Sequence, residues 1–135
     1  MCSGPALSVR DLRIQIDRQQ VVDGLSFDVM PGERVRLLGA SGSGKSFTAK
    51  AVLGLLPPNA QVSGSICIQG QESIAIPAAR RLAGTRVSMV FQDSLSALNP
   101  LVSIGSQLRE PFSRHHRLSR KAAIQAAVAL LAAMG

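Results

Sequence analysis

Apolar and polar residues alternate along much of the first third of the chain, which is the pattern of half-exposed β-strands. Residues 7–16 alternate except at Arg10 and Asp11, which predicts a strand with a slip that a bulge would explain. Residues 21–22 and 25–29 predict two further short strands, with Asp23 and Gly24 turning the chain between them. The chain therefore begins with an antiparallel portion.

Three further segments predict strands of different kinds. Residues 62–68 alternate and place Val62, Ile66 and Ile68 on one face, before a polar turn at 69–72. Residues 34–38 and 87–91 are compact apolar runs, typical of the buried strands of a parallel sheet. Such a sheet needs neighbouring strands and cover on both faces, so these two runs predict an open apolar edge in the present chain.

Helices are expected at four places. Residues 47–56 have helical composition and end before Pro57, and a short helix is predicted at 78–82. Residues 103–109 predict a helix stopped by Pro111. Residues 119–134 are rich in alanine and predict a longer helix, with Ser119 as N-cap and Gly135 at the C-terminal cap.

Composition narrows the class of protein. The 135 residues are 46% hydrophobic and 17% charged, which excludes intrinsic disorder. Cys2 and Cys67 are too few and too distant for a disulfide framework. The longest nearly apolar run, 122–134, is too short to cross a bilayer, and no signal peptide is recognised at the start. We expect a cytoplasmic globular chain.

The formal charge of +7 favours an anionic partner, but the basic residues are scattered apart from a cluster within 109–121. The chain has no Trp and no Tyr, and its Phe residues do not interleave with this cluster to form a base-stacking platform. The cluster therefore predicts a solvated or subunit-contact surface rather than a nucleic-acid site. His115 and His116 are adjacent and lack partners at ligand spacing, so we expect surface residues and no metal site.

Residues 39–46, GASGSGKS, match the phosphate-binding pattern G-x-x-x-x-G-K-[ST]. Glycines let successive backbone N–H groups point at phosphate oxygens, and the following helix adds its positive end. Lys45 would place a charge on the β- and γ-phosphates, and the Ser46 hydroxyl would complete Mg²⁺ coordination. G-x-G-x-x-G is absent, so a dinucleotide-binding fold has little support.

The flanking motifs resemble those of the ATP-binding subunits of ABC transporters. The turn VMPGE at 29–33 precedes the phosphate loop, and VFQD at 90–93 ends a predicted strand. The run FQDSLSALNP at 91–100 is similar to the branch that serves peptide and nickel importers. The resemblance covers nearly the whole chain, from about residue 7 to residue 135.

This resemblance implies an α/β fold, a P-loop NTPase with the ABC-type nucleotide-binding domain, incomplete in these residues. Residues 1–92 would form the nucleotide-binding core with its antiparallel β portion. Residues 93–135 would form the glutamine loop and the start of a truncated helical subdomain.

The resemblance also implies roles for single residues. Lys45 and Gln92 would be catalytic, and Ser46 and Gln92 would hold Mg²⁺. The residues implied in ATP binding are Gly39, Ser41, Gly42, Ser43, Gly44, Lys45, Ser46 and Phe47. The implied partners are a transmembrane permease subunit and a second ATP-binding subunit, with no nucleic acid. The subunit would lie on the cytoplasmic face of the membrane and associate with it only through its partner.

The chain departs from the family pattern in two respects. Ile16 stands where the family usually has an aromatic ring that stacks on adenine. The motif L-S-G-G-Q, the Asp-Glu strand end and the switch histidine do not occur in these residues. The chain alone is therefore expected to be inactive as an ATPase.

Two other functions remain open from the sequence. The first is a truncated, non-catalytic nucleotide-binding or interaction fragment. The second is a DNA-repair or chromosome ATPase, which the positive charge suggests. Residues 119–134 lack sustained heptads and no cysteine cluster follows Gln92, so the second is disfavoured.

Overall fold

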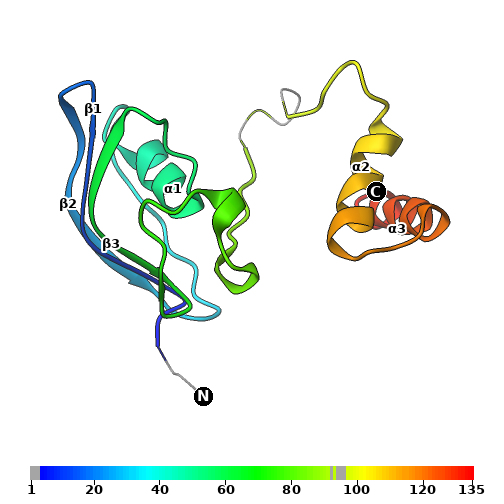
Figure 1. Ribbon diagram of the computed structural model, residues 1–135, viewed down its shortest axis with the longest axis horizontal. Helices are drawn as coiled ribbons and strands as arrows, with labels where there is room; N and C mark the ends of the chain where they lie inside the picture. Colours follow the sequence, from blue (N-terminus) through cyan, green and yellow to red (C-terminus); the bar gives the residue numbers. More distant parts are fainter. Residues whose placement is uncertain (1–3, 92, 94–96) are drawn as a thin grey trace. The chain divides into compact units, whose positions relative to one another are not determined.

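The computed structural model describes residues 4–91, 93 and 97–135 (Figure 1). Contacts divide the chain into two compact units, Met1–Met89 and Val90–Gly135. The first unit is a sheet with a helix, and the second is a pair of helices.

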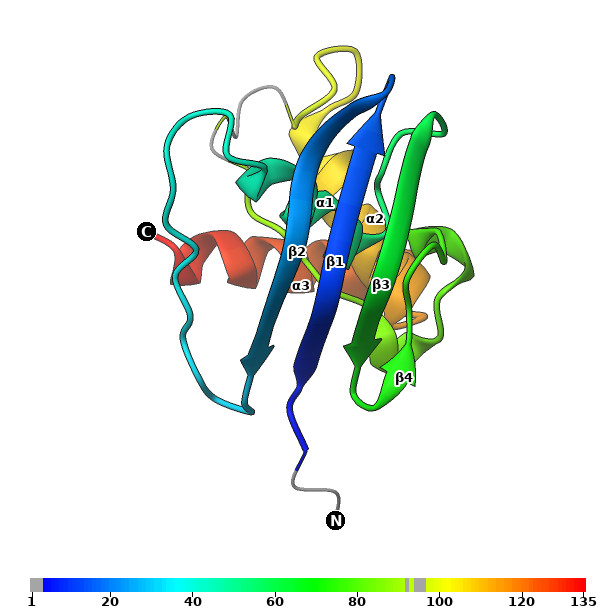
Figure 2. The same cartoon turned by 90° about the vertical axis from the view of Figure 1, so that its left-hand side faces the viewer.

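The first unit is built on an antiparallel sheet with the strand order β2-β1-β3-β4 (Figure 2). Its strands are β1 (Leu7–Ile16), β2 (Gln19–Val29), β3 (Ala60–Ile68) and the short β4 (Gln71–Glu72). The predicted strand at 62–68 is confirmed, with Ile66 and Ile68 buried and Val62 half-buried. The antiparallel character of this portion is confirmed as well.

Two irregularities in the sheet keep apolar residues on the core side. In β1 the register shifts between Val9 and Leu12, which confirms the predicted slip at Arg10 and Asp11. An extra residue there turns both Val9 and Leu12 toward the core, where each is fully buried.

The second irregularity corrects a prediction. Residues 21–29 are not two strands joined by a turn, because β2 runs unbroken from Gln19 to Val29. Asp23 and Gly24 lie at a register shift within this strand, where three residues of β2 face two of β1. The same residue types occur in turns and in β-bulges. Because β2 pairs along all of β1, these residues form a bulge and not a turn.

Helix α1 (Lys45–Leu53) contributes Ala51 and Val52 to the hydrophobic core, beside buried residues of β1, β2 and β3. The predicted end of this helix at residue 56 was wrong. Gly54 adopts a left-handed conformation with φ 73° and donates to the carbonyl of Ala51, so the helix ends at Leu53. The predicted helix at 78–82 is reduced to a single 3-10 turn, Ala78–Arg80, and a second follows at Ala83–Thr85.

The two predicted parallel strands are not formed. Residues 34–38 and 87–91 have no strand assignment and pair with none of β1–β4 in the described part of the chain. A strand exists only where a neighbour completes its hydrogen bonds, and neither segment has one here. Their apolar side chains are correspondingly exposed, with Leu38 at 87% and Val90 at 94%.

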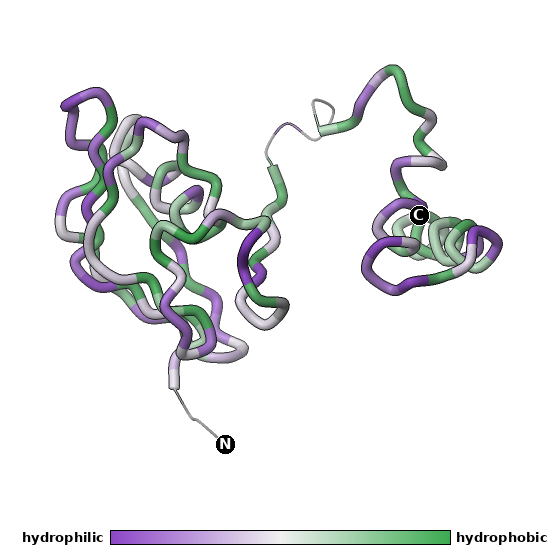
Figure 3. Tube along the Cα trace, viewed as in Figure 1, coloured by the Kyte–Doolittle hydropathy of each residue, from purple (hydrophilic) through white to green (hydrophobic). Residues whose placement is uncertain are grey.

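The second unit contains α2 (Ile104–His115) and α3 (Arg120–Ala133), which pack on each other. The Ser119 hydroxyl accepts from the amide of Ala122, as predicted for an N-cap, and α3 is hydrophobic over most of its length (Figure 3). The predicted stop at Pro111 was wrong, because α2 continues through this residue to His115. Proline removes one hydrogen bond of the helical ladder, and packing against α3 compensates for that loss. Among the described residues no helix has the length and apolar character needed to cross a membrane.

Candidate nucleotide-binding site

The phosphate-binding motif lies between a tight turn and the start of α1. In the turn, the amide of Glu33 donates to the carbonyl of Met30 at 3.0 Å, and the Glu33 carboxylate accepts from the Met30 amide at 2.7 Å. This closed turn begins the extended segment that leads to Gly39. The loop then reverses at residues 41–44, and Lys45 is the first residue of α1.

Gly44 is required by packing as well as by conformation. Its φ is 85°, and a Cβ at this position would collide with the backbone carbonyl of Val21 and lie 2.9 Å from Val22 Cγ2. Gly42 also has a positive φ, 81°, but a Cβ there would meet nothing within 4 Å. The loop is therefore pressed against β2 at Gly44 and open at Gly42.

The Lys45 ammonium lies across the loop. Its Nζ donates to the carbonyl oxygens of Gly39 at 2.5 Å and Ala40 at 2.6 Å, and to Ser43 Oγ at 3.0 Å. These contacts draw the first and last parts of the loop together around one positive charge. A bound anion would have to compete with them for the ammonium, which has three donors.

The first turn of α1 presents free backbone donors. Its N-cap is Gly44, which offers no side chain to accept from them, and the first turn contains no acidic residue. Unpaired N–H groups and the positive helix end make this turn an anion site. The glycine loop, Lys45 and these amides together suit a triphosphate, and the exposed Ser46 hydroxyl suits Mg²⁺.

The structure brings most of the predicted site residues into one segment. The loop and first turn of α1 hold Gly39, Ser41, Gly42, Ser43, Gly44, Lys45, Ser46 and Phe47. The side chain of Phe47 points elsewhere, because it packs against the hydrophobic core and lies under Lys50 Nζ at 5.4 Å from its ring centroid. Only the backbone of Phe47 is therefore available to a phosphate.

Two other predicted positions lie apart from this segment. Gln92, expected to be catalytic and to bind Mg²⁺, lies outside the described residues. Ile16, expected at the adenine position, ends β1 and packs half-buried against the core cluster.

Sequence reasoning missed the supports of the loop. Thr48 is buried, and its hydroxyl and amide both contact the carbonyl of Gly44, at 3.0 and 2.9 Å. The carbonyl of Val21 forms the floor beneath Gly44. A threonine one turn after a glycine could have suggested the first contact, whereas the second joins distant parts of the chain and leaves no local signal.

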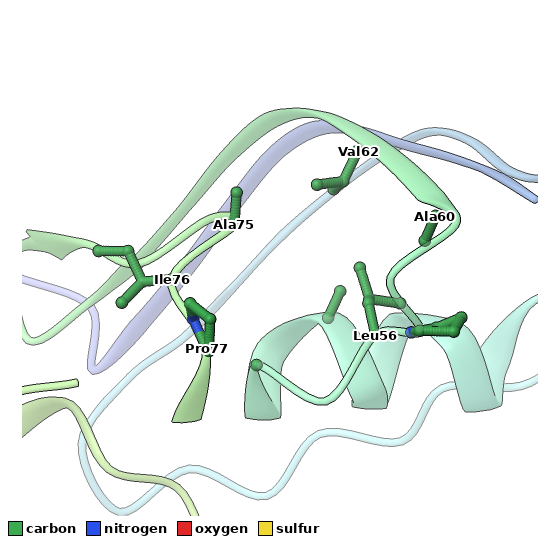
Figure 4. Close-up of a pocket in the computed structure, with 9 residues that line it drawn as sticks. Leu56, Ala60, Val62, Ala75, Ile76 and Pro77 are labelled. Carbon is green, nitrogen blue, oxygen red and sulfur yellow. The ribbon is translucent and has the colours of Figure 1, made fainter. Parts of the chain in front are cut away.

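Hollows border both ends of α1. One of about 200 Å³ adjoins the loop and includes Asp23, Ser43 and Lys45 in its lining. Another of about 180 Å³ lies at the C-terminal end of α1 (Figure 4). Its lining contains only apolar residues and glycine, so it offers no charged or polar side chain to a phosphate; the residues are Ala51, Gly54, Leu56, Pro57, Ala60, Val62, Ala75, Ile76 and Pro77.

A buried arginine holds this far end of α1. The Arg81 side chain donates to the carbonyls of Val52 and Ala51 in the last turn, and to those of Ser73 and Ile76. Burial lowers its pKa from the ordinary value. The helix is thus fixed at its C-terminus by a cation, which the negative end of the helix dipole favours.

A glycine-rich loop that opens into a helix whose first residue is lysine defines a P-loop nucleotide-binding fold. The ABC transporter family matches residues 22–134, and the chain belongs to this family. The fold is accordingly part of an ABC nucleotide-binding domain, as the sequence motifs predicted.

Curated relatives share most of this chain. It is 44% identical to "Oligopeptide transport ATP-binding protein OppD" of Mycobacterium tuberculosis, over 97% of this chain and 22% of the relative. It is 37% identical to "Dipeptide transport ATP-binding protein DppD" of Bacillus subtilis, over 96% of this chain and 41% of the relative. A bacterial Atm1-family ABC exporter with ATP bound is 30% identical, with a TM-score of 0.48 over 59% of this chain and 14% of the exporter. The chain thus spans between 14% and 41% of the length of these proteins.

Proposed function

We propose that this chain is the nucleotide-binding part of an ATP-binding subunit that drives import of peptides, nickel or a similar solute. The observation that carries the proposal is the phosphate loop, in which Lys45 joins two carbonyls and a hydroxyl at the start of α1. Relatives whose names specify oligopeptide and dipeptide transport support the choice of solute.

In this proposal the loop binds the triphosphate of ATP through its backbone. The donors come from Gly39, Ser41, Gly42, Ser43, Gly44, Lys45, Ser46 and Phe47. Lys45 also supplies a charge to the β- and γ-phosphates. Ser46 and Gln92 hold Mg²⁺, which neutralises phosphate charge when bound. Catalysis then consists of positioning and charge stabilisation, because phosphoryl transfer to water needs little covalent chemistry from the protein.

The proposed setting follows from the family. Residues 1–92 serve as the core and residues 93–135 as the glutamine loop and start of the helical subdomain. The subunit works on the cytoplasmic face of the membrane with a permease subunit and a second ATP-binding subunit. Relatives described as transport ATP-binding proteins support these partners.

The proposal is tested by replacing Lys45 and measuring binding of a fluorescent ATP analogue. Lys45→Ala should weaken binding by roughly ten- to a hundredfold, because it removes one charge-assisted contact of about 1.5–3 kcal/mol. Lys50→Ala is the matched control, since Lys50 lies on the same helix but its Nζ sits over the Phe47 ring. Equal affinity of the Lys45 variant and the unaltered chain would contradict the proposed site.

A further inference from the structure

The bend between α2 and α3 carries a dense group of exposed basic side chains. Arg114, Arg117, Arg120 and Lys121 are all exposed, and we call these four residues the basic bend. His115 and His116 lie between them and are exposed too. Figure 3 shows this bend as strongly hydrophilic, next to the hydrophobic body of α3.

The charge in this region is little neutralised by its own chain. Residues 94–135 contain five Lys and Arg residues against a single acidic residue, Glu110, which gives +4 of the chain's total of +7. Glu110 pairs with Arg114 across one helical turn at 3.5 Å, and both side chains are largely exposed. A pair of this kind is weak and leaves most of the positive potential directed to solvent.

Two of these four charges oppose helix stability, whereas Arg114 lies in the last turn of α2, where the helix dipole favours a cation. Arg120 and Lys121 form the start of α3, whose first turn contains no acidic residue. Cations at this end of a helix are repelled by its dipole, whereas acidic residues would stabilise it. Arg120 and Lys121 therefore suit an external anionic surface better than the helix that carries them.

Apolar side chains accompany the basic bend. Leu118 lies between Arg117 and Arg120 and is 37% exposed. Ile124 and Val128 on α3 are 43% and 59% exposed and line a hollow with residues of α2. At about 100° per residue, Arg120, Ile124 and Val128 fall on one side of the helix. Basic side chains with aliphatic side chains beside them are typical of surfaces that lie on anionic bilayers.

We propose that the basic bend binds the anionic phospholipid headgroups of a bilayer. Flexible cations near a bilayer contribute additively and need no fixed geometry, which suits a group of exposed Arg and Lys side chains. A nucleic-acid surface is less favoured, because Phe112 is the one Phe, Tyr or Trp in residues 97–135, and the centroids of the Phe112 and His116 rings already lie 6.0 Å apart. The proposal goes beyond the proposed function, and it changes the expectation that the membrane is reached only through a partner.

The test is flotation of the 135-residue chain with vesicles of phosphatidylcholine containing roughly 30% phosphatidylglycerol, compared with pure phosphatidylcholine. The chain should bind only the anionic vesicles. The fraction of chain released from them should increase as NaCl is raised from about 0.1 to 0.5 M. Replacing Arg114, Arg117, Arg120 and Lys121 by Gln should weaken binding about fivefold for each charge removed. The matched control replaces four exposed arginines of the first unit, Arg18, Arg34, Arg80 and Arg86, by Gln and should retain binding.

Three results would overturn the proposal. The first is that the chain binds neutral and anionic vesicles equally. The second is that the control variant loses as much vesicle binding as the variant of the basic bend. The third is that the chain binds no vesicles but binds a single-stranded oligonucleotide through the basic bend. Circular dichroism checks that both variants keep their helices. Replacing the three arginines of the bend by Lys preserves charge and should preserve binding, so the proposal stays testable if the glutamine variant does not fold.

Discussion

Arg81 shows how a single side chain joins parts of the first unit that no secondary structure connects. Its residue is 5% exposed, and it donates to carbonyls of Ala51, Val52, Ser73 and Ile76. Two of these carbonyls lie in the last turn of α1, where no further turn of helix follows and, within the described part of the chain, Ala51 accepts otherwise only from the Gly54 amide that ends the helix. The contact is therefore a C-terminal cap supplied by a distant residue.

We expect Arg81→Ala to lower the free energy of unfolding by about 2–4 kcal/mol, because it removes four hydrogen bonds of a buried side chain. Among the described contacts, only the Ala51 and Ser73 carbonyls then keep a backbone donor, from Gly54 and Ile76. Urea unfolding followed by circular dichroism measures the change. Arg80→Ala is the control, since Arg80 is exposed and adjacent in sequence, and it should change stability by less than about 0.5 kcal/mol. Similar losses in the two variants would show that the buried contacts of Arg81 are unimportant.

Glu72, in the edge strand β4, accepts hydrogen bonds from backbone amides. Its Oε1 accepts from the amides of Ile66, Ser73 and Ile74 at 3.0, 3.0 and 2.9 Å, and its Oε2 accepts from the Ser65 hydroxyl. Partial burial raises the pKa of this carboxyl, but the hydrogen bonds from Ser65 and the three amides outweigh it. The net pKa lies below the ordinary value of 4.5.

A carboxyl with a lowered pKa stabilises the fold at pH above its unfolded value and loses that contribution as the pH falls through the folded value. The contribution of Glu72 to the free energy of unfolding should therefore be fully present above pH 4.5 and decrease as the pH falls below that value. Glu72→Gln should lower stability at neutral pH by about 1 kcal/mol and flatten the decline in acid. Urea unfolding at neutral and acidic pH tests this. Glu110→Gln serves as control because Glu110 makes an exposed ion pair with Arg114 and accepts from no backbone amide in the described contacts, and an unchanged acid response for Glu72→Gln would refute the assignment.

At the scale of elements, the phosphate loop depends on how closely α1 approaches β2. That approach is set at Gly44, whose missing side chain lets the backbone rest on the Val21 carbonyl. Gly42 has a similar backbone conformation but faces open space. The two glycines therefore separate the effect of conformational strain from the effect of packing.

Gly44→Ala should lower the free energy of unfolding by about 3 kcal/mol or more, because strain and collision with β2 add together. Gly42→Ala should lower it by about 1–2 kcal/mol, from strain alone. Chemical denaturation of the two variants side by side gives the comparison. Equal losses would mean that α1 can move away from β2 at little cost.

At the scale of the whole molecule, the two apolar segments without strand partners limit what the chain can do alone. Residues 34–38 lead directly into the phosphate loop and residues 87–91 lead toward Gln92. Under the proposed function, Lys45 and Gln92 each follow one of these two segments, and no described strand pairs with either segment. Their exposed apolar side chains also favour association between molecules.

We therefore expect the purified 135 residues to release no phosphate from ATP above the level of a Lys45→Ala control. The unfolding transition should be broad and weakly cooperative, because the exposed apolar side chains of these two segments contribute no burial. Even complete domains have a net stability of only about 0.1 kcal/mol per residue, so such a loss is large. Phosphate release and thermal unfolding test the two statements. Turnover that depends on Lys45, together with a sharp transition, would contradict them.

The sequence by itself determined the features that depend on neighbouring residues. The spacing of glycines and Lys45 predicted the phosphate loop, the slip at Arg10 and Asp11 predicted the bulge of β1, and Ser119 predicted the start of α3. Caps, bulges and glycine loops arise from local backbone chemistry, so a short stretch of sequence contains their cause. The assignment to the ABC transporter family rested on such motifs and was confirmed.

Only the tertiary structure decided the features that depend on distant partners. β1 made residues 19–29 one strand, and α3 supported α2 beyond Pro111. Residues 34–38 and 87–91 have no strand structure because no strand of the described residues pairs with them. Arg81 reaches carbonyls about 30 residues away in sequence, which no local pattern indicates. Hydrogen bonds and packing between remote segments outweigh local propensity, and they exist only once the chain has folded.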